Sequence, residues 1–160
     1  MNAVVIPSDD PLYREKRARL AENDLSTQQT FQLSAIESNP LPENLLPYLR
    51  MCYATSEEEL WAVEFNSNAH PVSPINEAQV LANLHDHLTQ RLRAYRTSIE
   101  EDEAVLANSK TGPREAVATR LLRIEKIILK NALHQVESHT HYSTSVNDAK
   151  SYIKNGVRFA

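Results

Sequence analysis

Apolar residues recur at helical spacing in two long segments of the chain, residues 73–95 and 113–137. In the first segment five residues share one arc of a helix: Leu81, Leu84, Leu88, Leu92 and Tyr95. In the second, an inner face and its wider flank are formed by Val117, Leu121, Ile124, Ile128 and Ala132, with Leu122, Leu129 and Leu133. Such stripes predict amphipathic helices. We expect the two helices to pack antiparallel at the centre of an all-α, multi-helix bundle.

The joint between these helices carries its own start signals. Thr97 and Ser98 each precede a glutamate by three residues, so Thr97 with Glu100 and Ser98 with Glu101 are both candidate capping boxes. An acidic run then lies at the positive pole of the next helix, which predicts a short helix over residues 98–108. The run could bind a metal or a basic peptide, but stabilisation of the helix dipole accounts for it.

Shorter elements precede the two stripes. Residues 8–22 predict a helix that starts at an acid-Pro signal and has a thin apolar stripe, typical of a surface helix. Residues 42–53 predict a helix with four inward residues: Leu45, Leu46, Leu49 and Tyr53. Ser56 opens a further short helix containing Trp61, which we expect in the core. Residues 3–6 and 30–33 are candidate extended segments, the first with no evident partner.

Polar positions of the second long helix predict its solvent face: Glu115, Arg123, Lys126, Lys130 and Glu137. Glu125 departs from this division because it falls inside the apolar arc. A carboxylate there needs a partner or must be neutral. We expect hydrogen bonds from Arg91, or from the backbone N–H groups of Thr97 and Ser98. The alternative is that the arc ends at Glu125 and the carboxylate contacts water.

Composition narrows the class of protein. The chain has 160 residues, enough for one domain with a modest core. Its two glycines favour helix over sheet. The formal net charge of −4 does not indicate nucleic-acid binding. The single cysteine, Cys52, excludes an internal disulfide and a cysteine metal cluster, and we expect it in the core. No apolar run reaches the roughly 20 residues of a membrane span, and we find no targeting signal.

Histidines cluster near the C-terminal end, at positions 134, 139 and 141. Metal binding by His134, His139 and His141 is an alternative, but a metal site normally adds a carboxylate or a cysteine. We therefore expect no metal. Asn147 or Asp148 is a candidate cap for a last short helix that ends at residues 155–156.

We find no phosphate-binding loop, dinucleotide fingerprint, zinc-protease motif or nucleophile elbow, and no pattern typical of a methyl-transfer site. No catalytic residue is therefore assigned. The residues themselves indicate a helical binding or packing domain.

Four stretches carry a family resemblance: residues 41–50 (LPENLLPYLR), 71–77 (PVSPINE), 91–103 (RLRAYRTSIEEDE) and 120–129 (RLLRIEKIIL). Together they resemble the C-terminal substrate-binding lobe of the Rubisco large-subunit methyltransferase family. Enzymes of that family carry a catalytic SET domain followed by an all-helical lobe. The resemblance runs from about residue 6 to residue 136. One departure is Ile124, which stands where the family pattern leads us to expect glycine.

The resemblance implies a division of the chain. Residues 1–7 would be a tail following a SET domain outside this sequence, residues 8–138 the helical substrate-binding domain, and residues 139–160 a C-terminal extension. S-adenosylmethionine would bind the SET domain, so we expect no cofactor in this chain. The expected partner is a folded protein whose lysine, or in an actin-directed branch histidine, is methylated. The family implies a chloroplast location in a plant or alga, and a cytoplasmic one otherwise.

Two interpretations stay open. The chain is either the non-catalytic lobe of a SET-domain protein-lysine methyltransferase, or a free-standing helical adaptor that lacks the catalytic half. In both, we expect protein binding through the mixed-charge face formed by Glu101, Asp102, Arg123 and Lys126, because charged rims steer encounters between proteins.

Overall fold

The computed structural model describes residues 2–139 and 158–159. These residues form six helices and three short strands. In chain order they are β1 (Asn2–Val5), α1 (Tyr13–Ala21), β2 (Gln28–Phe31), α2 (Leu45–Tyr53), α3 (Glu57–Ala62), α4 (Pro74–Arg93), α5 (Ile99–Ala107), α6 (Pro113–Glu137) and β3 (Arg158–Phe159). The expected mostly helical fold is confirmed, and the two long helices begin at the prolines that the sequence indicated.

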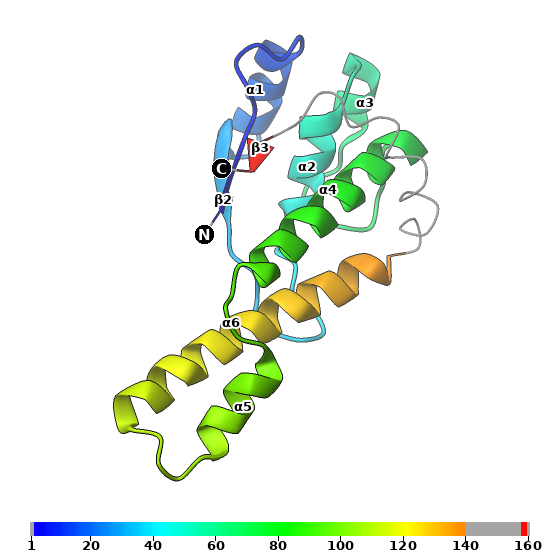
Figure 1. Ribbon diagram of the computed structural model, residues 1–160. Coiled ribbons are helices and arrows are strands. Elements are labelled where there is room, and N and C mark those ends of the chain that lie inside the picture. The colour runs from blue at the N-terminus through cyan, green and yellow to red at the C-terminus, as the bar shows by residue number, and fades with distance from the viewer. Residues whose placement is uncertain (1, 140–157, 160) are drawn as a thin grey trace.

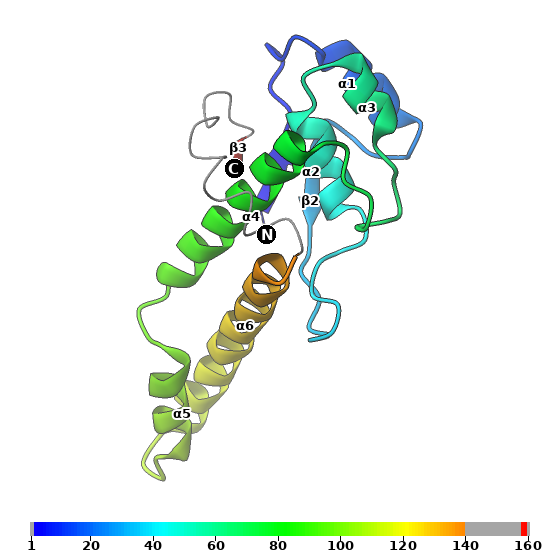
Figure 2. The ribbon, with the colours of Figure 1, turned by 90° about the vertical axis from the view of Figure 1, so that its right-hand side faces the viewer.

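The helices are arranged as a base and an arm (Figure 1). The arm, residues 97–126, consists of α5 and the N-terminal half of α6 and extends away from everything else. The base contains the strands, α1 to α4 and the C-terminal half of α6. Figure 2 shows α4 descending toward the arm and α6 returning beside it, so the expected antiparallel arrangement of the long helices is confirmed.

A small antiparallel sheet lies at the N-terminal edge of the base. β1 is the central strand, paired with β2 on one side and with β3 on the other. The expectation that residues 3–6 lack a partner was therefore wrong. Tyr48 of α2 ties the sheet to the helices: its hydroxyl donates to the Ser26 carbonyl at 2.9 Å, and its ring meets Phe31 edge to face at 5.3 Å.

Helix α2 forms the centre of the core. All nine of its residues are buried, not only the four predicted to point inward. Arg50 is among them, and its guanidinium makes two 2.8 Å hydrogen bonds to the Glu77 carboxylate of α4, with both side chains fully buried. Breaking such a pair would leave an uncompensated charge away from water. This ion pair therefore links α2 to α4 in the interior of the base.

Helix α1 was predicted as a surface helix, and its lysine corrects that prediction. Lys16 is 1% exposed, and its Nζ donates to the Asp10 carboxylate at 2.6 Å and to the Cys52 carbonyl at 2.9 Å. Cys52 is buried, as predicted. Burial is the main reason why the pKa of its thiol is raised far above the usual value. The contact of Lys16 thus attaches α1 to the centre of the core.

Trp61 corrects another prediction. Its side chain is 60% exposed, with the Arg19 guanidinium 5.2 Å from the ring centroid. The short helix α3 buries Leu60 instead, so the neighbouring Trp61 points outward. The contact with Arg19 is a cation–π interaction on the surface.

Helix caps follow the sequence signals. The hydroxyls of Ser56, Ser73 and Ser98 each accept a hydrogen bond from the backbone N–H three residues later. At Ser98 the capping box is complete, because Glu101 accepts from the Ser98 backbone N–H at 2.7 Å. These caps fix where α3, α4 and α5 begin.

Within the described residues no helix is long and apolar enough to cross a membrane. The last predicted helix, with its candidate caps Asn147 and Asp148, lies outside the described residues, as does His141.

Candidate functional site

Helix α6 changes surroundings halfway along its length. Its C-terminal half buries Leu129, Ala132, Leu133 and Val136 against the base. The N-terminal half lies in the arm, where α5 covers one side. Four residues predicted for the inner face or its flank are therefore exposed: Val117 at 54%, Leu121 at 59%, Leu122 at 42% and Ile124 at 49%. That prediction was wrong for the arm because no other described element reaches this part of the helix.

Lys126 was predicted to face solvent and is instead 1% exposed. Its Nζ donates to the Asp102 carboxylate at 2.6 Å and to the Thr97 hydroxyl at 2.7 Å, and it lies 5.4 Å from the centroid of the Tyr95 ring. Thr97 in turn donates to Asp102 at 2.7 Å. The three polar groups satisfy one another where α4, α5 and α6 meet. This cluster joins the arm to the base.

Two opposing effects act on the pKa of Asp102. Burial acts to raise it, but hydrogen bonds from Lys126 and Thr97, together with the charge of Lys126, hold the pKa of this carboxyl below its usual value. Asp102 is therefore ionised over the whole physiological pH range. Because the buried carboxylate and the buried ammonium are bonded to each other, they present no free polar group to a partner protein.

The other two residues proposed for protein binding remain accessible. Glu101 is exposed, although its carboxylate also caps α5. Arg123 pairs with Glu103 at 2.7 Å, with its side chain 34% exposed. The structure thus brings Asp102 and Lys126 together inside the arm and leaves Glu101 and Arg123 on its surface. Protein binding by the four residues stays a prediction.

Glu125 has a different partner from the one expected. The carboxylate is exposed and accepts a 2.8 Å hydrogen bond from the Tyr95 hydroxyl, not from Arg91, Thr97 or Ser98. The pKa of Tyr95 is raised, first by burial and then by this hydrogen bond. The alternative in which the apolar arc ends at Glu125 is the one the structure supports.

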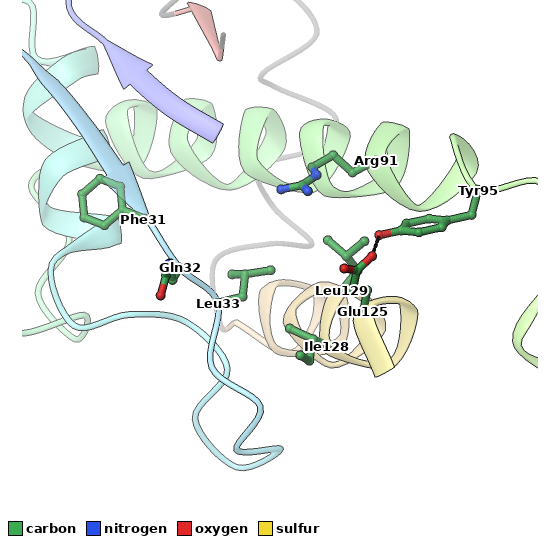
Figure 3. A pocket seen from close by; sticks show the side chains of 8 residues that line it. All are labelled: Phe31, Gln32, Leu33, Arg91, Tyr95, Glu125, Ile128 and Leu129. Carbon is green, nitrogen blue, oxygen red and sulfur yellow. Dashed lines mark hydrogen bonds between the residues drawn. The ribbon is translucent and has the colours of Figure 1, made fainter. Parts of the chain in front are cut away.

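An open pocket of about 290 Å³ lies where the end of β2, the end of α4 and the middle of α6 converge (Figure 3). Its lining combines apolar and charged side chains: Phe31, Gln32, Leu33, Arg91, Tyr95, Glu125, Ile128 and Leu129. Arg91 extends from α4 on the side of that helix that faces α6 (Figure 3). A smaller pocket adjoins it and shares Phe31, Leu33 and Arg91. Sequence reasoning missed this site because the loop after β2 that closes it has no periodic pattern.

The histidines form no metal site within residues 2–139 and 158–159, where no group of three or more potential ligands converges. His134 is exposed, whereas His139 lies 3.6 Å from the buried Glu77 carboxylate. His85 contacts Glu137 at 2.9 Å across the pair of long helices. His85 and His139 thus each contact a carboxylate of a neighbouring helix.

Comparisons with known proteins agree with this architecture. A protein-family model described as Rubisco LSMT substrate-binding matches residues 7–129. Actin-histidine N-methyltransferase from Callithrix jacchus is 32% identical over 148 residues, and the human protein is 31% identical over 148 residues. Both alignments cover 86% of this chain, but it spans only about a quarter of those relatives' length (24% and 25%).

Solved structures show the same fold. A structure titled as the SET domain of LSMT bound to lysine and AdoHcy superposes with a TM-score of 0.70 at 22% identity, covering 84% of this chain and 32% of that one. Rubisco LSMT bound to AdoMet gives 0.70 at 20% identity, covering 96% and 38%. Since the family model spans more than half of the sequence, the chain belongs to the Rubisco LSMT substrate-binding family.

Proposed function

We propose that this chain is the non-catalytic, protein-binding lobe of a SET-domain protein methyltransferase. The observation that supports it most is the family match over residues 7–129, which covers both the base and the arm. The exposed arm supports it further, because an extension with uncovered apolar side chains is suited to contact a second protein.

The substrate we propose is a folded protein. Actin is the first candidate because the relatives from human and Callithrix jacchus are named for it. Rubisco is the second candidate, through the name of the family. The residue methylated, lysine or histidine, would be selected in the catalytic domain. A chloroplast location stays a prediction from the family, and the actin-directed relatives give it no support.

A binding measurement tests the proposal. The 160-residue chain is immobilised, and purified monomeric actin and Rubisco holoenzyme are passed over it. We expect weak, saturable binding to one of them, because a lobe separated from its catalytic domain loses the benefit of linkage. Absence of binding to both proteins would overturn the proposal.

Cofactor binding provides the second test. We place S-adenosylmethionine binding outside this chain, because the sequence holds no pattern typical of a methyl-transfer site. Titration calorimetry with S-adenosylmethionine should show no heat of binding. A micromolar dissociation constant would mean that the lobe is not a purely protein-binding one.

A further inference from the structure

An apolar stripe runs along the arm portion of α6, where it is uncovered, and ends just beyond the arm at the half-buried Ile128. Val117, Leu121, Ile124 and Ile128 follow one another at intervals of four, three and four residues, which confines them to an arc of about 60° over about 16 Å of helix. The first three are 54%, 59% and 49% exposed. Lys126 is on the opposite side of the helix, facing α5 through its ion pair with Asp102. The stripe therefore faces away from α5.

The stripe leads into the pocket of Figure 3. Its last residue, Ile128, lines that pocket together with Glu125, Leu33 and Arg91. A partner lying along α6 would thus reach a hollow at the base end of the stripe, where one of its side chains could be enclosed. The convex ridge and the pocket form one continuous surface.

Positive charge borders this surface. Arg114 and Arg120 fall on opposite edges of the stripe at 100° per residue, and Arg91 stands at its pocket end. None of the three guanidinium groups makes a hydrogen bond or an ion pair with another described residue. Glu125, the acid of this surface, is already hydrogen-bonded to Tyr95. The positive border is local, because the whole chain carries a net charge of −4.

The shape of the surface selects the kind of partner. An extended peptide binds by backbone hydrogen bonds at a sheet edge or by filling a concave groove. The stripe offers neither along most of its length, because the backbone groups of α6 are bonded within the helix. A straight ridge of side chains instead packs well against the grooves of another helix. Arginines on both edges, which form no ion pair within the described part of the chain, favour a helix with acidic edges.

We propose that the stripe and its pocket receive a helix of the protein substrate, with apolar residues along one face and Asp or Glu on both sides of that face. An apolar side chain at the end of that helix enters the pocket, and an acidic one pairs with Arg91. This inference rests on the proposed function for the origin of the helix. It places substrate contact on the face opposite α5, away from the exposed Glu101.

Two synthetic helical peptides test the charge selection directly. Both carry leucines at positions i, i+4, i+7 and i+11, one with glutamates on both edges and the other with lysines there. Fluorescence anisotropy with the whole chain should show about tenfold tighter binding of the acidic peptide, as expected for two or three exposed ion pairs. The double variant Arg114→Glu, Arg120→Glu should reverse the preference. Equal binding of both peptides by the unaltered chain would overturn the proposal.

Variants extend the test to the protein substrate. Leu121→Glu should weaken binding of the acidic peptide, and of whichever of actin and Rubisco binds the chain, by about tenfold or more. Ile75→Glu is the matched control, because Ile75 is 54% exposed on α4, outside the arm. Lys110→Glu is the control for charge. Circular dichroism verifies that each variant keeps its helices.

The outcomes separate the two proposals. If the protein substrate binds and Leu121→Glu leaves its affinity unchanged, the stripe is not the substrate surface and the proposed function stands. If neither protein binds while the peptide preference appears, the stripe is still a helix acceptor and the proposed function fails. A dimer of this chain that Leu121→Glu dissociates would identify a second copy as the occupant and overturn the inference.

Discussion

The base and the arm use the same kinds of residue in opposite ways. In the base, the apolar stripes form a buried core, and the Arg50–Glu77 ion pair is fully buried among them. In the arm, a comparable stripe on α6 is exposed, and the charged pair Asp102–Lys126 is the buried element. One helix passes through both regions without a break in its pattern. The pattern of a helix therefore shows which side is apolar, and its surroundings decide whether that side becomes core or interface.

The largest effect should come from breaking the ion pair of the base. Glu77→Ala leaves the buried Arg50 guanidinium without its carboxylate and should lower the free energy of unfolding by about 3 to 4 kcal/mol. Chemical denaturation measures this loss. Glu58→Ala, at an exposed position of α3, is the control and should change little. A loss below about 1 kcal/mol for Glu77→Ala would mean that the base tolerates an unpaired charge.

A matched pair of truncations on α6 compares the two regions directly. Leu129→Ala removes a side chain that is 4% exposed, and should cost about 2 to 3 kcal/mol through lost burial and a cavity. Leu121→Ala, two turns earlier and 59% exposed, should cost less than about 0.5 kcal/mol. Equal losses in thermal or chemical unfolding would contradict the division of α6 into a core half and an exposed half.

Breaking the charged pair of the arm should have a smaller and more local effect. Asp102→Ala strands Lys126 and should cost about 2 kcal/mol, less than a pair enclosed on all sides. Hydrogen exchange should show faster opening of residues 97–126 and unchanged protection of α2. Glu103→Ala, which breaks the exposed pair with Arg123, is the control. Loss of protection throughout the base would show that the arm and the base unfold together.

Lowering the pH should destabilise the arm by protonating Asp102. Since the pKa of this carboxyl is lower in the folded protein, its stabilisation is fully present above the usual aspartate value and is lost as pH falls through the lowered one. Hydrogen exchange or denaturation from neutral pH down into the acid range measures this. Asp102→Asn should remove this component of the pH dependence, and an identical profile in that variant would place the titrating group elsewhere.

The smallest effect is expected at Glu125. Its carboxylate is exposed and bonded to Tyr95, so Glu125→Ala should cost less than about 1 kcal/mol. Tyr95→Phe, which removes the same hydrogen bond from the other side, should match it. A loss near 3 kcal/mol would restore the idea of a desolvated pair at this position.

Local signals in the sequence predicted most of the fold. Ser73 and Ser98 cap the helices they were expected to cap, and Pro113 and Glu137 bound α6 as predicted. The errors arose where a residue depends on distant neighbours. By helical spacing Lys126 belongs to the solvent-facing side of α6. In the structure it is enclosed by Asp102 of α5 and by Thr97, which precedes α5. Neither that enclosure nor the exposure of Leu121 follows from sequence periodicity, because both depend on how far α5 and the base reach along α6.

The candidate site was harder to foresee than the fold. Glu101 and Arg123 were placed correctly on the surface, but the pocket depends on Leu33, Arg91 and Ile128 meeting from segments far apart in the sequence. No single stretch carries that information. The basic border of the stripe is a further example, since Arg114 and Arg120 resemble any solvated arginines until the uncovered ridge between them is known.

The buried thiol of Cys52 is an intrinsic probe for the opening of the base. The thiolate is the form that attacks an alkylating reagent, and burial disfavours that form so strongly that the closed protein should be almost inert to such reagents. Because the chain contains one cysteine, a single labelling rate reports how often the core of the base opens around Cys52. That labelling rate depends on the opening of the base and not on fraying of the arm. It therefore measures the opening of one region without any engineered probe.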